Sequence, residues 1–326
     1  MSNAAVSVDV HLTSRDVAAA LRHDARRGLT ADPKWLPPKW FYDERGSTLF
    51  DAITGLPEYY PTRREVEILE RRAGEVASAC PAGTLVELGS GTSAKTRLLL
   101  DALAAEGSLR RVVPFDVSQA TLRQAAGTLA AAYPGVEVHA VVGDFERHLH
   151  LLPPGGGRRL VAFLGGTIGN LDPRQRAVLL RTVADGLHPG DALLLGTDLV
   201  KAPARLVAAY DDAAGVTAAF NTNVLRVLNH ELGADFDPAR FAHVALWDPD
   251  QKWIEMRLRS LVDQTVSLPE IDLSVHFAEG EEIRTEISAK FHRHGVEVEL
   301  EAAGLHLARW WTDAAGDFAV SLAFPG

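Results

Sequence analysis

The chain has 326 residues, enough for one large domain or two smaller ones with a buried core. With 47% hydrophobic residues it has the composition of a globular protein, and a formal net charge of −10 argues against a nucleic-acid partner, which needs a basic surface. Cys80 is the only cysteine, which excludes an intrachain disulfide. Because neither a secretory signal nor an apolar run of about 18 residues stands out, we expect a cytoplasmic protein without a membrane partner.

The middle of the chain alternates apolar strands with amphipathic helices. This pattern predicts an α/β fold with a parallel sheet covered on both faces, and we place this core at residues 81–210. The predicted strands are 84–89, 110–116, 136–144, 158–171 and 191–200, and the predicted helices are 94–105, 122–132 and 174–187.

The flanking segments predict a second, smaller domain that binds substrate. Residues 1–80 read as mostly helical, and residues 211–290 read as an insertion that is first helical and then built of alternating strands. We assign both segments to the second domain. Residues 291–326, with a helix and an aromatic strand pattern, are expected to complete the core sheet.

A glycine turn follows the first core strand, in VELGSGTSAKTRLLL at 86–100. Gly89 and Gly91 let the backbone approach a ligand closely. The dinucleotide fingerprint tolerates Ala94 at its third position, whereas the triphosphate-binding loop requires glycine there, before Lys95 and Thr96. The turn alone leaves a dinucleotide, a triphosphate and S-adenosylmethionine open.

Acidic residues at successive strand ends favour S-adenosylmethionine. Glu87 gives the form V-E-L-G-S-G, which is typical of class I methyltransferases. Asp116 ends the next strand, where a carboxylate accepts ribose hydroxyls and repels a 2′-phosphate. Asp144 ends the third strand beside Phe145, whose ring suits an adenine face. The alternative is that Asp116 and Asp144 only cap helices or turns.

Two polar residues farther along are candidates for the acceptor side. Asn170 ends GGTIGN, which follows the fourth strand; the alternative is a simple turn with a left-handed Asn170. Tyr210 begins YDDAAGVTAAFN, which as a helix places Tyr210, Ala214, Thr217 and Asn221 on one face. Plain packing is the favoured interpretation of Tyr210 from this pattern alone.

Strand alternation groups Glu286 with Ser288 on one side of 281–291, where they could grip a small polar substrate. The other side would carry Ile283, Thr285 and Ile287. Solvent exposure is the default for a face with Glu286 and Ser288, and core packing is the default for Met256 in the strand 252–261.

Aromatic residues are dense near the N-terminal end: Trp40, Phe41, Tyr42, Phe50, Tyr59 and Tyr60. They could form a cage for a quaternary amine through cation–π attraction, or simply the core of a helical lid. No metal site is expected, because the pairs His148/His150 and His292/His294 lack a third ligand.

Together these segments resemble the actinobacterial L-histidine Nα-methyltransferases of ergothioneine biosynthesis, from about residue 17 to about residue 323. The resemblance rests on LPPKWFYDERGSTLFDAITGLPEYYPTRRE, LVELGSGTSAKTRLLLDAL, PFDVS, GDFE, FLGGTIGNL, LLLGTDLVK, AYDDAAGVTAAFN and WWTDAAGDF. It implies a class I, Rossmann-like methyltransferase sheet. It also implies three successive methyl transfers from S-adenosylmethionine to the α-amine of histidine, giving hercynine, without a metal.

The resemblance also assigns residues. It implies cofactor contacts at Gly89, Lys95, Asp116, Asp144 and Phe145, with Lys95 toward the methionine carboxylate. It implies histidine contacts at Tyr59, Asn170, Tyr210, Glu286 and Ser288: Asn170 and Tyr210 for the carboxylate, Glu286 and Ser288 for the imidazole. Tyr42, Phe50 and the Gly165 backbone would lie near the amine, and Met256 would line the imidazole pocket.

Three other functions stay open at this point. The chain could methylate another small amine or amino acid, or bind a metabolite without turnover. An NAD-dependent oxidoreductase ranks last, because the full catalytic set for it is lacking and the third strand ends in GDFE. We expect a monomer that takes L-histidine as its small-molecule substrate.

Overall fold

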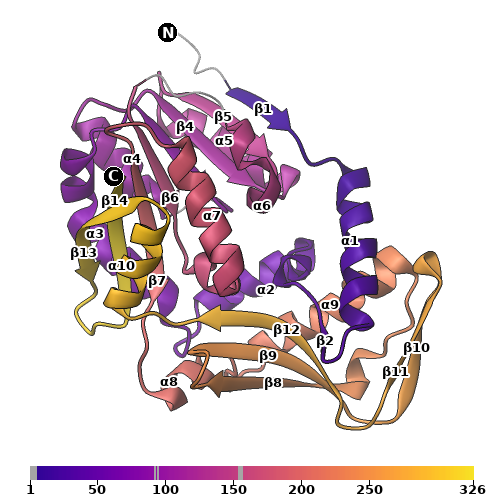
Figure 1. Cartoon of the computed structure of the whole chain (residues 1–326). Helices are drawn as coiled ribbons and strands as arrows, with labels where there is room; N and C mark the ends of the chain where they lie inside the picture. Colours follow the sequence, from indigo (N-terminus) through magenta and orange to yellow (C-terminus); the bar gives the residue numbers. More distant parts are fainter. Residues whose placement is uncertain (1–5, 92, 94, 153–156) are drawn as a thin grey trace. The chain divides into compact units, whose positions relative to one another are not determined.

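The computed structural model describes residues 6–91, 93, 95–152 and 157–326 (Figure 1). Ala94, which decides between the glycine-turn motifs, lies outside these residues. The chain forms two compact units. The first unit consists of the chain up to Thr13, Arg63–Leu199 and Phe291–Gly326, and the second consists of Ser14–Thr62 and Val200–Lys290.

The described residues of the first unit build an eight-stranded sheet in the order β1-β5-β4-β3-β6-β7-β14-β13. Neighbouring strands are parallel except at β14, which runs antiparallel to both β7 and β13. The strands are β1 (Val6–Val10), β3 (Thr84–Leu88), β4 (Arg111–Asp116), β5 (Glu137–Val142), β6 (Arg159–Phe163), β7 (Ala192–Asp198), β13 (Leu305–Thr312) and β14 (Phe318–Pro325). The predicted α/β class is confirmed.

Helices connect these strands, and two of them begin at a residue whose side chain caps the helix. Ser118 caps α5, and Asp172 with Gln175 forms a capping box at α7, where Pro173 takes the first position. The strands β3 and β7 are buried at every residue, as a sheet covered on both faces requires. The helices are α3 (Pro61–Ala79), α4 (Thr96–Ala105), α5 (Gln119–Ala132), α6 (Phe145–His148), α7 (Pro173–Gly186) and α10 (Arg293–Ala302).

The N-terminal segment contributes to both units. Residues 6–10, within a stretch predicted to be mostly helical, form β1 instead and pair in parallel with β5. The helix α3 belongs almost wholly to the first unit, because Ile68, Leu69 and Val76 join its hydrophobic core. The units therefore divide near residues 13, 62, 199 and 290, whereas the predicted segments divide at 80, 210 and 290.

The second unit packs helices against a four-stranded sheet in the order β2-β12-β9-β8. The helix α9 buries Phe220, Val224 and Leu228 in a core shared with Leu258 and Phe277. The strands are β2 (Lys34–Trp35), β8 (Phe241–Asp248), β9 (Trp253–Ser260) and β12 (Glu282–Ala289), with a hairpin of β10 (Gln264–Leu268) and β11 (Leu273–Phe277). The helices are α1 (Ser14–Leu29), α2 (Glu44–Thr54), α8 (Pro203–Ala208) and α9 (Val216–Leu232). Every helix among the described residues is too short or too polar to cross a membrane.

The strand β12 contains a bulge that corrects the predicted alternation. Its register against β9 shifts between Arg284 and Glu286. Ile283 pairs with Leu258, and after the shift Glu286 pairs with Met256 and Ser288 with Ile254. Since directly opposed residues share a face, Ile283 lies on the same side as Glu286 and Ser288. The prediction that placed Ile283 on the other side was wrong.

Tyr210 does not lie on a helix, which corrects a second prediction. The helix α8 ends at Ala208, and α9 begins only at Val216. The Asp212 carboxylate accepts hydrogen bonds from the backbone N–H groups of Val216 and Thr217, at 2.9 and 2.7 Å. This cap, together with Gly215 at φ +74°, starts the helix after Tyr210.

Candidate functional site

The glycine turn after β3 is held by hydrogen bonds to the buried Glu87, and its two glycines face open space among the described residues. Gly89 and Gly91 have φ values of +70° and +48°, and a Cβ added at either would meet no atom of the described residues within 4 Å. Beneath the turn, the buried Glu87 carboxyl accepts hydrogen bonds from the hydroxyls of Thr96 and Ser93, the latter at 2.9 Å. Burial raises the pKa of Glu87 to about 7. The turn is therefore fixed and leaves its outer side accessible to a ligand.

Acidic residues follow the next two strands, as predicted. Asp116 accepts hydrogen bonds from the backbone N–H groups of Gly91 and Ser118, at 2.9 and 3.0 Å, so its carboxylate supports the glycine turn and the start of the next helix. Its burial raises the pKa of the carboxyl. Asp144 directly precedes α6, and the Phe145 ring lies 5.5 Å from that of Phe163. Both acids stand at the carboxyl edge of the parallel strands, where α/β sheets bind ligands.

Lys95 forms an ion pair with Glu65, a fully buried residue of α3 that the sequence analysis missed. Glu65 also accepts a hydrogen bond from the Gly165 N–H at 2.7 Å. Gly196 on β7 makes room for it, since a Cβ there would lie 2.1 Å from the Glu65 Oε1. Helical spacing could have revealed Glu65, because it shares a face of α3 with Ile68 and Leu69.

The segment after β6 adds two of the predicted residues. Gly165 and Gly166 adopt φ values of +80° and +69°, which only glycine takes readily. Asn170 closes a short 3₁₀ helix, Thr167–Asn170, so the alternative of a left-handed Asn170 is wrong. The first unit thus brings Gly89, Lys95, Asp116, Asp144 and Phe145, together with Gly165 and Asn170, to the ends of adjacent strands.

Glu286 is a buried carboxyl in the second unit, 8% exposed. No described residue donates a hydrogen bond to it. Burial raises its pKa to about 8, although the charge of Lys290 acts in the opposite direction. The residue opposite Glu286 on the neighbouring strand β9 is Met256, which is 2% exposed. Solvent exposure of this face, the default expectation, is therefore wrong.

Ser288 and Tyr210 join Lys290 in a compact polar cluster. The Tyr210 and Ser288 hydroxyls are 2.7 Å apart, and the Lys290 Nζ donates to both, at 2.9 and 2.8 Å. All three residues are buried. Lys290 was missed by the sequence analysis, although it continues the alternation of Glu286 and Ser288.

The backbone of Tyr210 is anchored by His243. An amide nitrogen of Asn221 donates to the His243 Nδ1 at 2.8 Å, and the His243 Nε2 lies 2.8 Å from the Tyr210 carbonyl oxygen. Because an amide N–H₂ only donates, Nδ1 is the acceptor and Nε2 carries the hydrogen. Burial lowers the pKa of His243, which favours this neutral form.

The predicted aromatic residues form a connected cluster centred on Phe220. Tyr42 lies 5.6 Å from Phe50 and 5.4 Å from Phe220, measured between ring centroids. Phe50 lies 6.2 Å from Tyr59, whose ring is 6.4 Å from that of Tyr210. These mostly edge-on contacts build an aromatic surface beside Tyr210.

Trp40 and Tyr60 have structural partners instead. The Trp40 indole donates to Asp24 at 3.1 Å, and the Tyr60 hydroxyl accepts from Lys201 at 2.7 Å. The core interpretation therefore suits these two residues better than a place in an amine cage.

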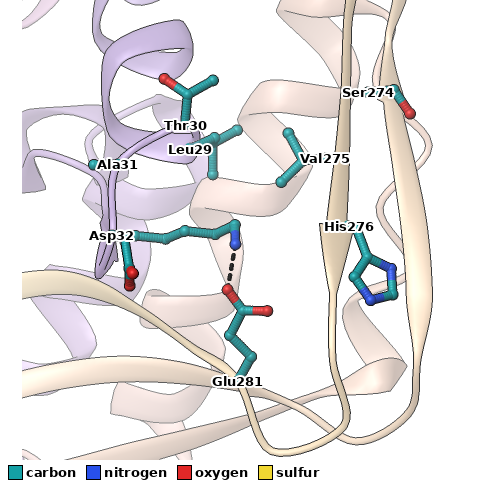
Figure 2. A pocket seen from close by; sticks show the side chains of 9 residues that line it. Leu29, Thr30, Ala31, Asp32, Ser274, Val275, His276 and Glu281 are labelled. Carbon is teal, nitrogen blue, oxygen red and sulfur yellow. Dashed lines mark hydrogen bonds and ion pairs between the residues drawn. The ribbon is translucent and has the colours of Figure 1, made fainter.

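A hollow of about 440 Å³ opens elsewhere in the second unit (Figure 2). The ion pair of Lys34 and Glu281 crosses it, and His276 and Asp32 stand at its margin. None of the predicted site residues lines this hollow. It is therefore distinct from the Glu286 cluster.

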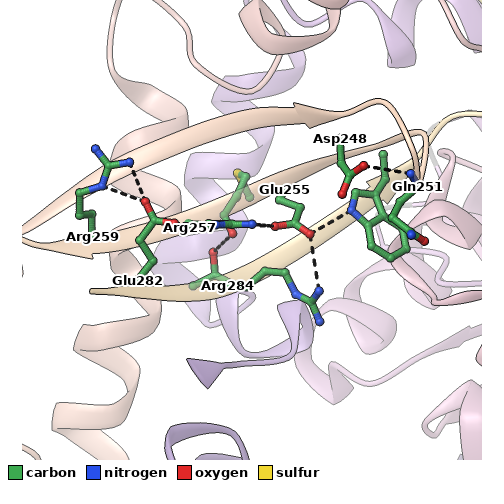
Figure 3. Close-up of polar contacts among 10 residues, drawn as sticks. Asp248, Gln251, Glu255, Arg257, Arg259, Glu282 and Arg284 are labelled. Carbon is green, nitrogen blue, oxygen red and sulfur yellow. Dashed lines mark hydrogen bonds and ion pairs between the residues drawn. The ribbon is translucent and has the colours of Figure 1, made fainter. Parts of the chain in front are cut away.

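The face of the β8–β9–β12 sheet opposite Glu286 carries a network of ion pairs (Figure 3). Glu282 binds Arg257 and Arg259 at 2.7 and 2.6 Å, and Glu255 binds Arg257 and accepts from the Trp253 indole. Successive side chains of these strands point to opposite faces of the sheet. The paired charges therefore lie on one face, and the buried carboxyl of Glu286 lies on the other.

Comparison with known proteins identifies the family. A family model described as "Histidine-specific methyltransferase, SAM-dependent" matches residues 21–325. The chain is 59% identical to histidine N-alpha-methyltransferase of Mycolicibacterium smegmatis and 60% identical to that of Mycobacterium tuberculosis; each alignment covers 98% of this chain and 99% of the relative. Ergothioneine biosynthesis protein 1 of Neurospora crassa is 37% identical over 62% of this chain and 23% of its own length.

These matches confirm the resemblance inferred from the sequence motifs. They span both units, so the Glu286 cluster and the glycine turn fall within the matched region. The chain belongs to the family of histidine-specific, S-adenosylmethionine-dependent methyltransferases.

Proposed function

We propose that this chain transfers three methyl groups, one after another, from S-adenosylmethionine to the α-amine of L-histidine. The product would be hercynine, and the reaction the first step of ergothioneine biosynthesis. The names of its close relatives and of the fungal relative support this proposal. We propose the cytoplasm as the compartment.

The observation that carries the proposal is the buried carboxyl of Glu286, which no described residue satisfies with a hydrogen bond. Such a group costs free energy unless a ligand supplies the donor. An imidazole N–H supplies it, and the apolar side chain of another amino acid does not. Glu286 would therefore select histidine over apolar amino acids, which would leave the carboxyl unpaired.

The other residues of the second unit are assigned to the remaining groups of histidine. Ser288 would bind the second imidazole nitrogen, with Met256 packing against the ring, and Tyr210 would bind the carboxylate together with Asn170. Tyr42, Phe50 and Tyr59 would line the amine, where aromatic faces stabilise the growing positive charge of the methylated nitrogen.

The first unit fits the methyl donor. The open glycine turn can accept the backbone of the ligand, Asp116 the ribose hydroxyls, and Asp144 with Phe145 the adenine. Lys95 would bind the methionine carboxylate. The donor supplies an electrophilic methyl carbon, and these residues hold and orient it. The Gly165 backbone would position the amine, whose proton must leave before each attack.

Incubation of the purified full chain with L-histidine and S-adenosylmethionine tests the proposal. Mass spectrometry should show histidine in which three hydrogens are replaced by methyl groups, and three molecules of S-adenosylhomocysteine for each molecule of this product. Unchanged histidine beside a folded, donor-binding protein would refute it. A panel of other amino acids and small amines in the same assay tests the alternative acceptor.

A further inference from the structure

Lys290 belongs to the substrate side of the second unit but has no role in the proposed set of contacts. The residue is 3% exposed, and its ammonium donates to the hydroxyl oxygens of Tyr210 and Ser288. It also lies 4.7 Å from the centroid of the Tyr210 ring. A buried lysine is costly, so its place among two proposed substrate-binding hydroxyls calls for a reason.

The number of hydrogens in this cluster restricts how the hydroxyls are oriented. An ammonium has only hydrogens to offer, so both hydroxyl oxygens must accept from Lys290. Each hydroxyl has one hydrogen, and one of these two hydrogens occupies the 2.7 Å bond between Tyr210 and Ser288. The other hydrogen must point away from the ammonium and from the partner hydroxyl.

We propose that Lys290 is a positioning residue that makes the Tyr210–Ser288 pair a hydrogen-bond donor toward the amino-acid substrate. The inference rests on the proposed function, because it takes these two hydroxyls to be substrate contacts. A carboxylate at Tyr210, or a bare imidazole nitrogen at Ser288, would accept the outward hydrogen. Without the ammonium, either hydroxyl could rotate and turn a lone pair toward the same acceptor.

A double-mutant cycle separates this role from direct binding or simple support. Histidine binding to the full chain is measured by calorimetry in the presence of S-adenosylhomocysteine, which cannot donate a methyl group. The variants are Lys290→Met, Tyr210→Phe with Ser288→Ala, and all three substitutions together. Lys201→Met is the matched control, because Lys201 donates to the Tyr60 hydroxyl and lies over that ring in the same way.

We expect Lys290→Met to weaken histidine binding by about tenfold or more, the loss typical of hydrogen bonds to charged groups. In the background without the two hydroxyls, the same substitution should change affinity less than about twofold. Lys201→Met should leave histidine affinity within about twofold, and S-adenosylhomocysteine affinity should stay unchanged in Lys290→Met. In turnover, Lys290→Met should raise the KM for histidine more than it lowers kcat.

Two results would overturn the inference. One is an unchanged histidine affinity in Lys290→Met. The other is an equal loss in both backgrounds, which is expected if Lys290 contacts histidine itself or acts through Glu286. If Tyr210→Phe with Ser288→Ala binds histidine as the unmodified chain does, the proposed substrate contacts fail instead. Should that double variant not fold, the cycle is run separately with Tyr210→Phe and with Ser288→Ala.

Discussion

Three buried ionisable side chains, Glu65, Glu286 and Lys290, show at the residue scale how this molecule places polar groups in its interior. Each is less than 9% exposed, a burial that costs free energy unless partners compensate. Glu65 is compensated within the protein, by Lys95 and the Gly165 N–H. No described residue donates a hydrogen bond to Glu286, so a bound ligand is proposed to compensate its burial.

Replacing Glu286 by alanine should weaken histidine binding by about 10- to 100-fold, because a buried imidazole N–H left without its hydrogen-bond partner costs about 1–3 kcal/mol. Glu286→Gln should lose less histidine affinity than Glu286→Ala, since its amide oxygen still accepts a hydrogen bond from an imidazole N–H. Titration calorimetry with histidine measures both effects. Glu282→Gln, on the opposite face of the same strand, is the control and should bind histidine normally.

Lys95→Met should destabilise the protein by about 3 kcal/mol, because it leaves the buried Glu65 carboxylate without its cation. The double variant Lys95→Met with Glu65→Gln should recover most of that loss, since no unpaired charge remains. Chemical denaturation gives both values. Equal stability of the single and double variants would show that Lys95 does not compensate Glu65.

At the scale of elements, strands were easier to predict than their exact registers. Runs of apolar residues define β3, β4 and β7, because burial on both faces requires such runs wherever they occur. The bulge in β12 depends on pairing with β9, a partner distant in sequence, so alternation alone misplaced Ile283. The start of α9 depends on the Asp212 cap, which the helical pattern through Tyr210 concealed.

Gly196→Ala tests how closely two elements approach. The added Cβ would lie 2.1 Å from the Glu65 Oε1 and so displace a carboxyl that binds Gly165 and Lys95. We expect a loss of about 2 kcal/mol in stability and weaker S-adenosylhomocysteine binding. Gly74→Ala, on α3 itself, is the control: a Cβ there meets no atom within 4 Å, so denaturation should show no loss.

At the scale of the whole molecule, the chain passes between the two units at four points, so neither unit is one continuous stretch. Sequence patterns identified the sheet, the glycine turn and the acidic strand ends, because these are local features. The same patterns did not reveal Glu65 and Lys290, because the importance of each comes from contacts with residues far away in sequence. The residue assignments taken from the resemblance stay predictions until the binding measurements are made.

The stability of the molecule should fall as pH rises from about 4.5 to about 7, through Glu87. Its pKa is raised by burial to about 7, so in this window the unfolded chain releases a proton that the folded chain keeps. The contribution is on the order of 3 kcal/mol, from about 1.4 kcal/mol per pH unit. Glu87→Gln, which stays neutral, should gain stability relative to the unmodified chain across this window in denaturation at pH 5 and pH 8.

Glu67→Gln serves as the control for this pH dependence. The backbone N–H of Ala314 and the side chain of Arg64 lower the pKa of Glu67, so its contribution is fully present above its unfolded pKa. The stability difference between Glu67→Gln and the unmodified chain should therefore stay constant between pH 5 and pH 8. A constant difference for Glu87→Gln as well would contradict the assignment to Glu87.

The strand order has a consequence for how the chain must be made. The strand β7 lies between β6 and β14, and β14 follows every other strand in the chain. Until β14 leaves the ribosome, β7, which is buried at every residue in the folded chain, presents an unpaired edge, which is a template for aggregation. A nascent chain stalled before Phe318 would therefore depend on chaperones to stay soluble.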